Sequence, residues 1–233
     1  MTKTGPMLPG DGKTDYERYL RVTELLSLQK SLEQIVNPDE PLFQTTHQTA
    51  ELWLKQIDFE MSRAVSAIRA GELGLATDLL ERSTRVLDLL RQQIVILEMM
   101  TPADYHVIRT RALGRGSGQE SPGFNRLLDV GDRLWPAVEA ALAEVDLKPL
   151  DILRAPRENE SLNRLIQALL NYDGAFMKWR YTHMRLAMRI IGSRVKSLKG
   201  VPVTQLEAGT REPLFPLLWD AISDLTDETR PEY

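Results

Sequence analysis

Helical periodicity is the feature of this sequence that most constrains its fold. Apolar side chains recur every three or four residues along almost the whole chain, which is the spacing of one face of an α-helix. No segment shows the strict apolar–polar alternation of a half-buried β-strand. A chain of 233 residues can bury one substantial core, and no internal repeat divides it. We therefore expect a mobile N-terminal arm over residues 1–13 and a single all-α domain, a helical bundle, over residues 14–233.

Start and stop signals divide this pattern into separate helices. Thr14 and Thr101 are capping hydroxyls with acidic residues in the turn that follows, Gly71 is a stop signal, and three glycines within residues 114–118 break any helix. The helices expected from these signals cover residues 14–35 with a break near 23, 43–70, 75–99, 101–113, 121–145, 150–153, 160–194 and 213–225.

The composition excludes several kinds of chemistry. The chain has no cysteine, which rules out disulfides, cysteine nucleophiles and thiolate-bound haem or iron–sulfur clusters. A net charge of −4 and a pI near 5.5 give no reason to expect a nucleic acid or an anionic membrane as partner. No apolar run approaches the roughly 20 residues of a membrane span, and residues 1–12 lack the apolar core of a signal peptide. We therefore expect a cytoplasmic protein.

His183 is the first candidate for a functional residue. The chain holds only three histidines, so a bound transition metal has few side chains to choose from. His183 interrupts the apolar stripe of the long helix expected over residues 160–194. A neutral imidazole on the buried side of a helix can hold iron from one side, as the proximal histidine of haem proteins does. The other interpretation is a core histidine whose nitrogens are satisfied by its neighbours.

Two further pairs of candidate residues share helix faces. Phe43 and His47 lie four residues apart on an apolar face, so His47 points inward at the level of Phe43. His47 is either a structural core histidine or a pocket imidazole that moves a proton beside a substrate. Tyr105 and Arg109 have the same spacing, and Arg109 is either an exposed charge or, in a pocket, a bidentate clamp for a carboxylate. His106 points to another side of that helix and is expected at the surface.

Four segments in a fixed order carry long motifs. They read Asp15-Tyr16-x-x-Tyr19-Leu20-x-x-x-Glu24-Leu25-Leu26-x-Leu28-Gln29, Phe43-x-x-x-His47-Gln48-Thr49-x-Glu51-Leu52-Trp53-x-Lys55-Gln56, Leu97-Glu98-x-Met100-Thr101-Pro102-x-Asp104-Tyr105-x-x-x-Arg109, and Trp179-Arg180-x-x-His183 with Arg189-x-Ile191-Gly192. Together these motifs resemble the signatures of the tryptophan 2,3-dioxygenase family, from about residue 15 to residue 192.

The resemblance implies an all-helical enzyme that encloses haem b and opens the indole ring of tryptophan with O2. It implies that His183 is the axial ligand of the haem iron and that His47 faces the indole N–H from the distal side. Phe43 would pack on the indole and the haem, Arg109 would bind the substrate carboxylate, and Tyr105 would shape the same pocket. One imidazole, an apolar lid and one charged anchor suit a zwitterionic amino acid on a haem face.

The resemblance also implies further site residues and an assembly. Ser117 and Gly118 would lie along the haem edge. Tyr16, Tyr19 and Leu20 correspond to a segment that the family donates to the active site of a neighbouring subunit. We therefore expect a homo-oligomer, a tetramer or a dimer, in which assembly and catalysis are linked.

Two loops depart from the family pattern. The family usually carries a Gly-Thr-Gly-Gly-Ser-type loop after residue 192, which contacts the substrate ammonium group. This chain has a different sequence over residues 193–204, in which Thr204 is a candidate replacement for the missing threonine, and residues 113–124 differ as well. These departures leave the expected haem site intact and open the question of substrate and product.

Three functions are therefore compared. The first is two-atom oxygen insertion into the indole of tryptophan or a substituted tryptophan, which gives an N-formylkynurenine-type product. The second is a haem-dependent monooxygenase that hydroxylates a tryptophan-like or tyrosine-like substrate in secondary metabolism. The third is a haem-binding or helical interaction protein without catalysis. The presence of Phe43, His47 and Arg109 together favours the first.

Overall fold

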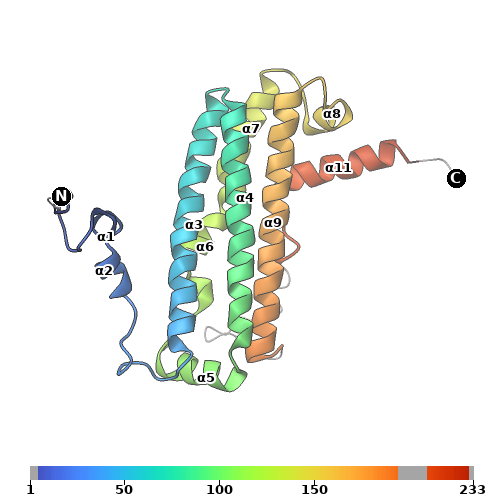
Figure 1. Ribbon diagram of the computed structural model, residues 1–233. Helices are drawn as coiled ribbons and strands as arrows, with labels where there is room; N and C mark the ends of the chain where they lie inside the picture. The colour runs from blue at the N-terminus through green and yellow to red at the C-terminus, as the bar shows by residue number, and fades with distance from the viewer. Residues whose placement is uncertain (1–4, 194–208, 231–233) are drawn as a thin grey trace.

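Three long helices form the framework of the protein. The computed structural model describes residues 5–193 and 209–230, in which α3 (Glu40–Arg69), α4 (Leu73–Val95) and α9 (Glu160–Ile191) lie side by side with α4 in the middle (Figure 1). The described residues contain no β-strand, so the predicted all-α class is confirmed. None of the helices in these ranges is long and apolar enough to cross a bilayer.

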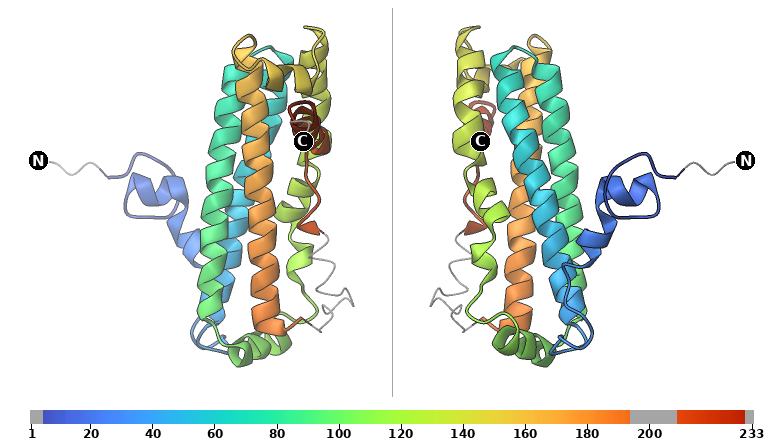
Figure 2. Two further views of the ribbon diagram at one scale, coloured as in Figure 1. Left: turned by 90° about the vertical axis from the view of Figure 1, so that its right-hand side faces the viewer. Right: turned by 90° about the vertical axis from the view of Figure 1, so that its left-hand side faces the viewer.

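A fourth column of helices packs against this framework. It consists of α6 (Pro122–Leu128) and α7 (Val130–Ala143), which both contact α3 (Figure 2). The sequence predicts one helix over residues 121–145, but Asp129, with ψ near 0°, interrupts it. The interruption divides this segment into two helices, each of which packs on α3.

The local end signals place the other helices correctly. Gly71 has a φ of +74°, which glycine adopts without strain, and it ends α3 as predicted. The Thr101 hydroxyl accepts the Asp104 N–H at 3.2 Å and starts α5 (Pro102–Arg111). Helix α5 crosses one end of the bundle (Figure 1). These two signals depend only on neighbouring residues, which explains why the sequence reveals them.

Two apolar clusters form the core. The larger one joins α3, α4, α7 and α9 along the bundle and includes the fully buried Ile57, Leu80 and Phe176. The smaller one lies at the α5 end of the bundle, where Phe43 and Tyr105 pack against it. Its buried members are Leu97, Met100, Ile108, Leu186 and Ile190. This smaller cluster supports Phe43 and Tyr105, two of the predicted site residues.

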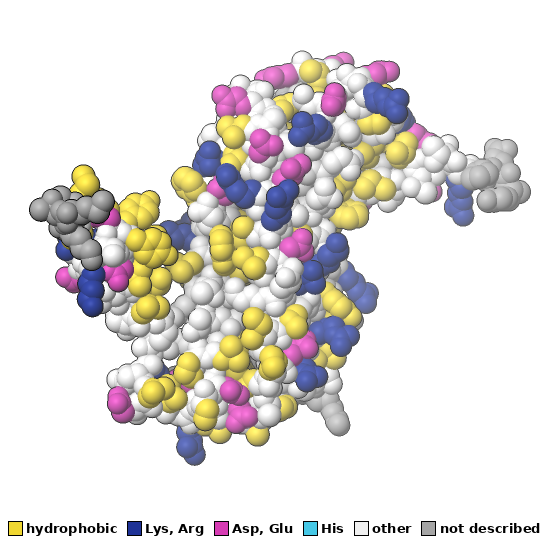
Figure 3. All heavy atoms as spheres, viewed as in Figure 1, with side chains coloured by type: hydrophobic (Ala, Val, Ile, Leu, Met, Phe, Trp, Pro, Cys, Tyr) yellow, Lys and Arg dark blue, Asp and Glu magenta, His cyan; other side chains and the backbone are white. Residues whose placement is uncertain are grey.

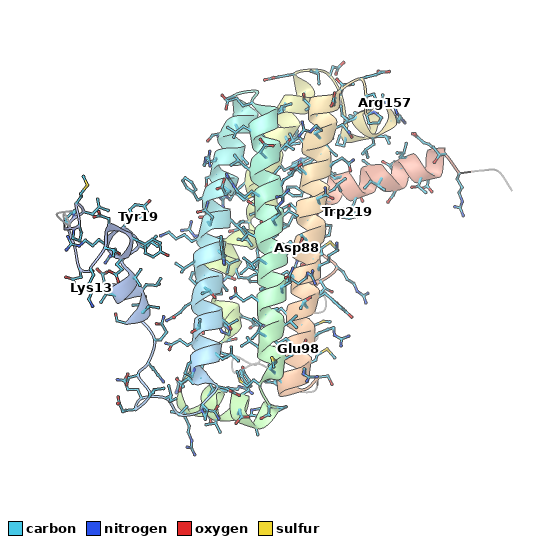
Figure 4. All side chains as sticks on the ribbon, in the orientation of Figure 1. Lys13, Tyr19, Asp88, Glu98, Arg157 and Trp219 are labelled. Carbon is cyan, nitrogen blue, oxygen red and sulfur yellow. The ribbon has the colours of Figure 1, made fainter. Side chains whose placement is uncertain are left out.

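The last helix is held by one buried carboxylate. Asp173 of α9 is fully buried and accepts the backbone N–H groups of Leu214 and Phe215 at 3.0 and 3.1 Å. It also accepts the indole N–H of Trp219 at 2.9 Å. Trp219 lies in α11 (Pro216–Glu228), which packs against α8 (Pro149–Arg154), and Figure 4 places it beside α9. Asp173 thus fixes α11 to the bundle.

The N-terminal segment extends away from the bundle. Two short helices, α1 (Asp15–Leu20) and α2 (Val22–Leu26), stand apart from the long helices in all three ribbon views (Figures 1 and 2). Arg21, with a φ of +51°, separates them, and a reciprocal capping box of Thr14 and Glu17 starts α1. The predicted break near residue 23 is therefore confirmed.

The prediction that this helix continues to residue 35 is wrong. The chain leaves the helical conformation after Leu26. The Lys30 N–H donates to the side chain of Gln44 at 3.0 Å, and the Val36 N–H donates to Glu40 at 2.7 Å. These bonds to α3 use backbone groups that a continued helix would need for its own ladder.

Candidate functional site

One cavity brings five of the predicted site residues together. It has a volume of about 710 Å³ and lies between α3, α4, α9 and the segment that joins α5 to α6. Phe43 and His47 come from α3, Ser117 and Gly118 from the glycine-rich segment, and His183 from α9. The apolar side chains on its walls are Phe43, Ala50, Leu54, Leu90, Ile94, Leu97, Ile108, Ala112, Leu113, Phe124, Leu128 and Trp179.

His183 offers a neutral imidazole to this cavity. Burial, with a smaller contribution from the positive charge of His47, lowers its pKa from 6.5 to about 4. The indole of Trp179, one turn earlier on α9, stacks parallel to its ring at 5.4 Å between centroids. No described residue hydrogen-bonds to its nitrogens, and a methyl group added to Gly118 would lie 3.9 Å from Nε2. His183 therefore differs from a core histidine satisfied by its neighbours.

His47 faces the same cavity with a defined hydrogen-bonding role. Its Nδ1 lies 2.7 Å from the carbonyl oxygen of Phe43, which can only accept, so Nδ1 carries the proton. Its Nε2 is then an acceptor in the neutral ring. Burial lowers the pKa of His47, and the Phe43 carbonyl and the Glu51 carboxylate oppose that shift. The rings of Phe43 and His47 are 4.2 Å apart, so Phe43 fixes both the tautomer and the place of the imidazole.

Tyr105 lies next to Phe43, and Arg109 lies near enough to Tyr105 to affect the pKa of its hydroxyl. Tyr105 and Arg109 both belong to α5, and the Tyr105 ring is 6.0 Å from that of Phe43. Burial raises the pKa of the Tyr105 hydroxyl, and the charge of Arg109 opposes this shift. Neither side chain is among the residues that line the cavity. His106 is exposed, as predicted.

Ser117 and Gly118 form one wall of the cavity. Ser117 starts a short 3-10 helix, η2 (Gly118–Glu120), through a capping box with Glu120. Tyr16, Tyr19 and Leu20 lie elsewhere, on α1, where they are 70%, 78% and 44% exposed. Figure 4 shows Tyr19 on the segment that stands apart from the bundle. Thr204 falls in residues 194–208, outside the described part of the chain.

Arg180 and Glu51 line the cavity as well, and the sequence analysis assigns them no role. The Arg180 side chain is only 14% exposed, and it donates to the carbonyl oxygen of Glu212 at 3.1 Å. Burial lowers its pKa. A side chain at Gly209 would collide with its guanidinium. Spacing is the signal for both: Arg180 precedes His183 by three residues, and Glu51 follows His47 by four, so each shares a helix face with a histidine.

The residues present fit a haem. The cavity volume lies within the roughly 300–1,000 Å³ of cofactor and small-molecule sites, and its walls are mostly apolar. The neutral imidazole of His183 is the form that binds iron, and Gly118 leaves space beside its Nε2. Arg180 places a guanidinium on the wall, where it pairs with the Glu212 carboxylate at 3.8 Å, and a guanidinium also suits the carboxylates of a haem. Iron held this way activates O2.

Fold and cavity thus define an all-α protein with a ligand pocket faced by two histidines. The family model described as tryptophan 2,3-dioxygenase matches residues 3–134. The tryptophan 2,3-dioxygenase of Caulobacter vibrioides is 32% identical over 254 aligned residues, which cover 88% of this chain and 95% of the relative. Those of Xanthomonas campestris pv. campestris and Xanthomonas euvesicatoria pv. vesicatoria are 28% and 30% identical, over 95% of this chain and 91% of each relative. The chain belongs to the tryptophan 2,3-dioxygenase family, a family of enzymes.

Proposed function

We propose that the protein is a haem-dependent oxygenase that inserts both atoms of O2 into the indole ring of tryptophan or a substituted tryptophan. The observation that carries this proposal is the pair of imidazoles on α3 and α9 that face one cavity. The two rings differ in hydrogen bonding, so one can bind a metal while the other can accept a hydrogen bond. Among the described residues, the neutral ring of His183 has no hydrogen-bond partner, and Nε2 of His47 is an acceptor without a donor. The names of the relatives supply the substrate and the two-atom outcome.

The cofactor in this proposal is haem b, held by His183 and flanked by Ser117, Gly118 and Arg180. Trp179 limits rotation of the His183 ring by stacking on it. Because burial keeps the imidazole neutral, no proton has to leave before iron binds. The apolar walls exclude water from the site, which strengthens every polar contact that a substrate makes there.

The substrate would be oriented by residues of α3 and α5. The indole N–H donates to Nε2 of His47, whose other nitrogen is occupied by the Phe43 carbonyl. The ring of Phe43 packs on the indole, and Tyr105 lies next to Phe43. Arg109 binds the carboxylate from the end of α5, where its fork matches two oxygens. An indole held by one nitrogen and one carboxylate presents a single edge to the oxidant.

Two-atom insertion and hydroxylation differ in their atom balance, which makes them distinguishable by experiment. When both oxygen atoms enter the substrate and the C2–C3 bond breaks, no external reductant is required. Hydroxylation leaves one oxygen atom that needs two electrons and two protons. Mass analysis of the product formed from tryptophan under ¹⁸O₂ tests the proposal: two labelled atoms are expected in an N-formylkynurenine-type product. A product with one labelled atom, or turnover of tyrosine alone, would contradict it.

The assembly in this proposal is a homo-oligomer completed by residues 5–27, which contain α1 and α2 and are called the helical arm below. Figure 3 shows apolar side chains on the helical arm and on the face of α3 and α4 that is turned to the viewer, called here the α3–α4 face. The exposed apolar side chains include Tyr16, Tyr19, Leu20 and Leu26 on the helical arm, Leu52 and Phe59 on α3, and Leu89 and Val95 on α4. Surfaces of this kind mark protein–protein contacts. The occupant proposed is a second copy, to whose cavity the helical arm contributes Tyr16, Tyr19 and Leu20.

A further inference from the structure

The carboxylate of Glu51 joins two walls of the cavity. Glu51 lies one turn after His47 on α3 and lines the cavity itself. One of its oxygens accepts the hydroxyl of Ser121, and the other accepts the backbone N–H of Gly123 at 3.1 Å. Both partners belong to the start of α6, about 70 residues further along the chain. The oxygenase reaction proposed above makes no use of this carboxylate.

Ser121 connects Glu51 to the first turn of α6. Its hydroxyl donates to Glu51 and accepts the N–H of Phe124 at 3.0 Å, so it is the cap of α6. The bond to a carboxylate is charge-assisted, which makes it stronger than a bond between neutral groups. One hydroxyl thus ties the first turn of α6 to the helix that carries His47.

Gly123 permits the close approach of α6 to α3. A Cβ atom at this position would lie 2.6 Å from Cβ of Leu54 and 2.7 Å from Oε2 of Glu51. Both distances are too short for any side chain other than hydrogen. The start of α6 is therefore pressed against α3, and Glu51 is the polar group at the point of contact.

The same connection reaches His183. From Ser121 the chain runs back through η2, whose first residue, Gly118, is the neighbour of the His183 ring. The Ser117–Glu120 capping box makes this short stretch rigid, because Glu120 accepts the Ser117 N–H at 2.9 Å. A wall of residues 116–121 thus stands between Glu51 on one side and His183 on the other.

We propose that Glu51 is a positioning residue, whose carboxylate fixes the wall of residues 116–121 relative to both histidines and so keeps a haem seated on His183. This inference rests on the proposed haem function, which it deepens. Glu51 touches no reacting atom in this account. It acts through Ser121 and Gly123, by holding the wall that would border the cofactor.

The first experiment measures the wall without any ligand. Hydrogen exchange of the full chain, followed by mass spectrometry, reports the amides of residues 117–124 in the parent and in the variants Glu51→Gln, Ser121→Ala and Ser121→Thr. A glutamine offers one acceptor oxygen where the glutamate offers two, so one donor at the start of α6 loses its partner. We expect exchange about tenfold faster in Glu51→Gln and Ser121→Ala. Ser121→Thr keeps the hydroxyl and should match the parent.

The second experiment uses haemin as the probe. Transfer of haemin from the loaded chain to an excess of apomyoglobin gives its dissociation rate. We expect roughly tenfold faster loss from Glu51→Gln and from Ser121→Ala, with parent behaviour restored in Ser121→Thr. The Soret band of the loaded variants should stay at the parent wavelength, because His183 is unchanged.

Glu60→Gln is the matched control. Glu60 is a buried carboxylate of the same helix that pairs with Arg63 and Arg82 and lines no part of the cavity. If Glu60→Gln accelerates exchange at residues 117–124 or haemin loss as much as Glu51→Gln does, general loosening explains both and the proposal fails. Faster exchange with unchanged haemin loss would reduce Glu51 to a helix cap. A parent chain that takes up no haemin would overturn the proposed function, whereas unchanged exchange in Glu51→Gln would overturn the positioning role alone.

Discussion

His183 links the protonation of one ring to the stability of the folded chain. Its pKa is lowered from 6.5 to about 4 in the folded state, so between these two pH values the unfolded chain binds more protons. The contribution of the neutral His183 ring to the free energy of unfolding is fully present above about pH 6.5, and it is lost as the pH falls toward 4. We expect the free energy of unfolding of the ligand-free chain to fall by about 3 kcal/mol across this window through His183. Urea unfolding at stepwise pH measures the loss.

Carboxylates also lose their charge in the same range, so the comparison needs a variant. His183→Gln cannot be protonated and should lack the His183 share of the slope, while the remaining acid sensitivity persists. Parallel stability curves for the parent and His183→Gln would show that the ring is free to ionise in the folded chain.

The same residue should decide cofactor binding. Removal of a neighbour that only orients a metal ligand costs roughly 10–100-fold in affinity, so loss of the ligand itself should cost more. We expect His183→Ala to bind haemin at least about 100-fold more weakly and to lose the parent Soret band. His106→Ala removes an exposed histidine and should leave the titration unchanged. An unaltered Soret band in His183→Ala would assign the iron to another group.

Arg109 is the residue proposed to bind the carboxylate of the substrate. Lysine keeps the positive charge but lacks the planar fork, so Arg109→Lys should raise KM for tryptophan about tenfold while kcat changes little. Tryptamine has no carboxylate, and steady-state kinetics with it should show no difference between the parent and the variant. Equal KM values for tryptophan would place Arg109 outside the site, in agreement with its absence from the cavity lining of the isolated chain.

At the scale of elements, the buried carboxylate of Asp173 holds α11. It accepts three N–H groups, from the backbone of Leu214 and Phe215 and from the indole of Trp219. An asparagine would turn an NH2 group toward one of these donors and leave it unpaired in the core. We expect Asp173→Asn to lower the free energy of unfolding by about 3 kcal/mol. Urea unfolding measures this loss, and Asp227→Asn, an exposed change on α11, should cost little.

Elements were predictable from the sequence wherever their ends depend on local signals. Gly71 and Thr101 mark the ends of α3 and the start of α5 because backbone conformation and capping need only nearby residues. Residues 27–35 were predicted as helix and are not, since Lys30 and Val36 bond to side chains of α3. Such tertiary bonds join positions that periodicity along one segment cannot relate.

For the candidate site too, the sequence predicts some features and not others. The faces that carry Phe43, His47 and His183 follow from helical spacing, and all three residues line the cavity. The partnership of Glu51 with Ser121 does not follow from spacing, because about 70 residues separate them. Sequence motifs can identify the residues of a site. The contacts by which one of these residues holds another in place join distant segments and are seen only in the folded structure.

At the scale of the whole molecule, the isolated chain leaves much apolar surface in water. Leu26 of the helical arm is 69% exposed, and Phe59 of α3 is 58% exposed. Burial of such side chains is worth roughly 1.5–3 kcal/mol each, which the chain forgoes unless another copy covers them. The helical arm and the α3–α4 face are the two surfaces concerned (Figure 3).

Assembly should therefore depend on the apolar side chains of the helical arm. Replacement of Tyr16 and Tyr19 by serine removes two large apolar side chains that are 70% and 78% exposed in the single chain, so the fold should persist while the assembly weakens. Each lost side chain should raise the dissociation constant at least about tenfold. Size-exclusion chromatography with light scattering, over a dilution series, measures the shift. Val145→Ser is a control, because Val145 is 49% exposed in the bundle, outside the helical arm. If the parent chain is monomeric, or if the double variant assembles as tightly as the parent, the helical arm has another role than completing a neighbouring cavity.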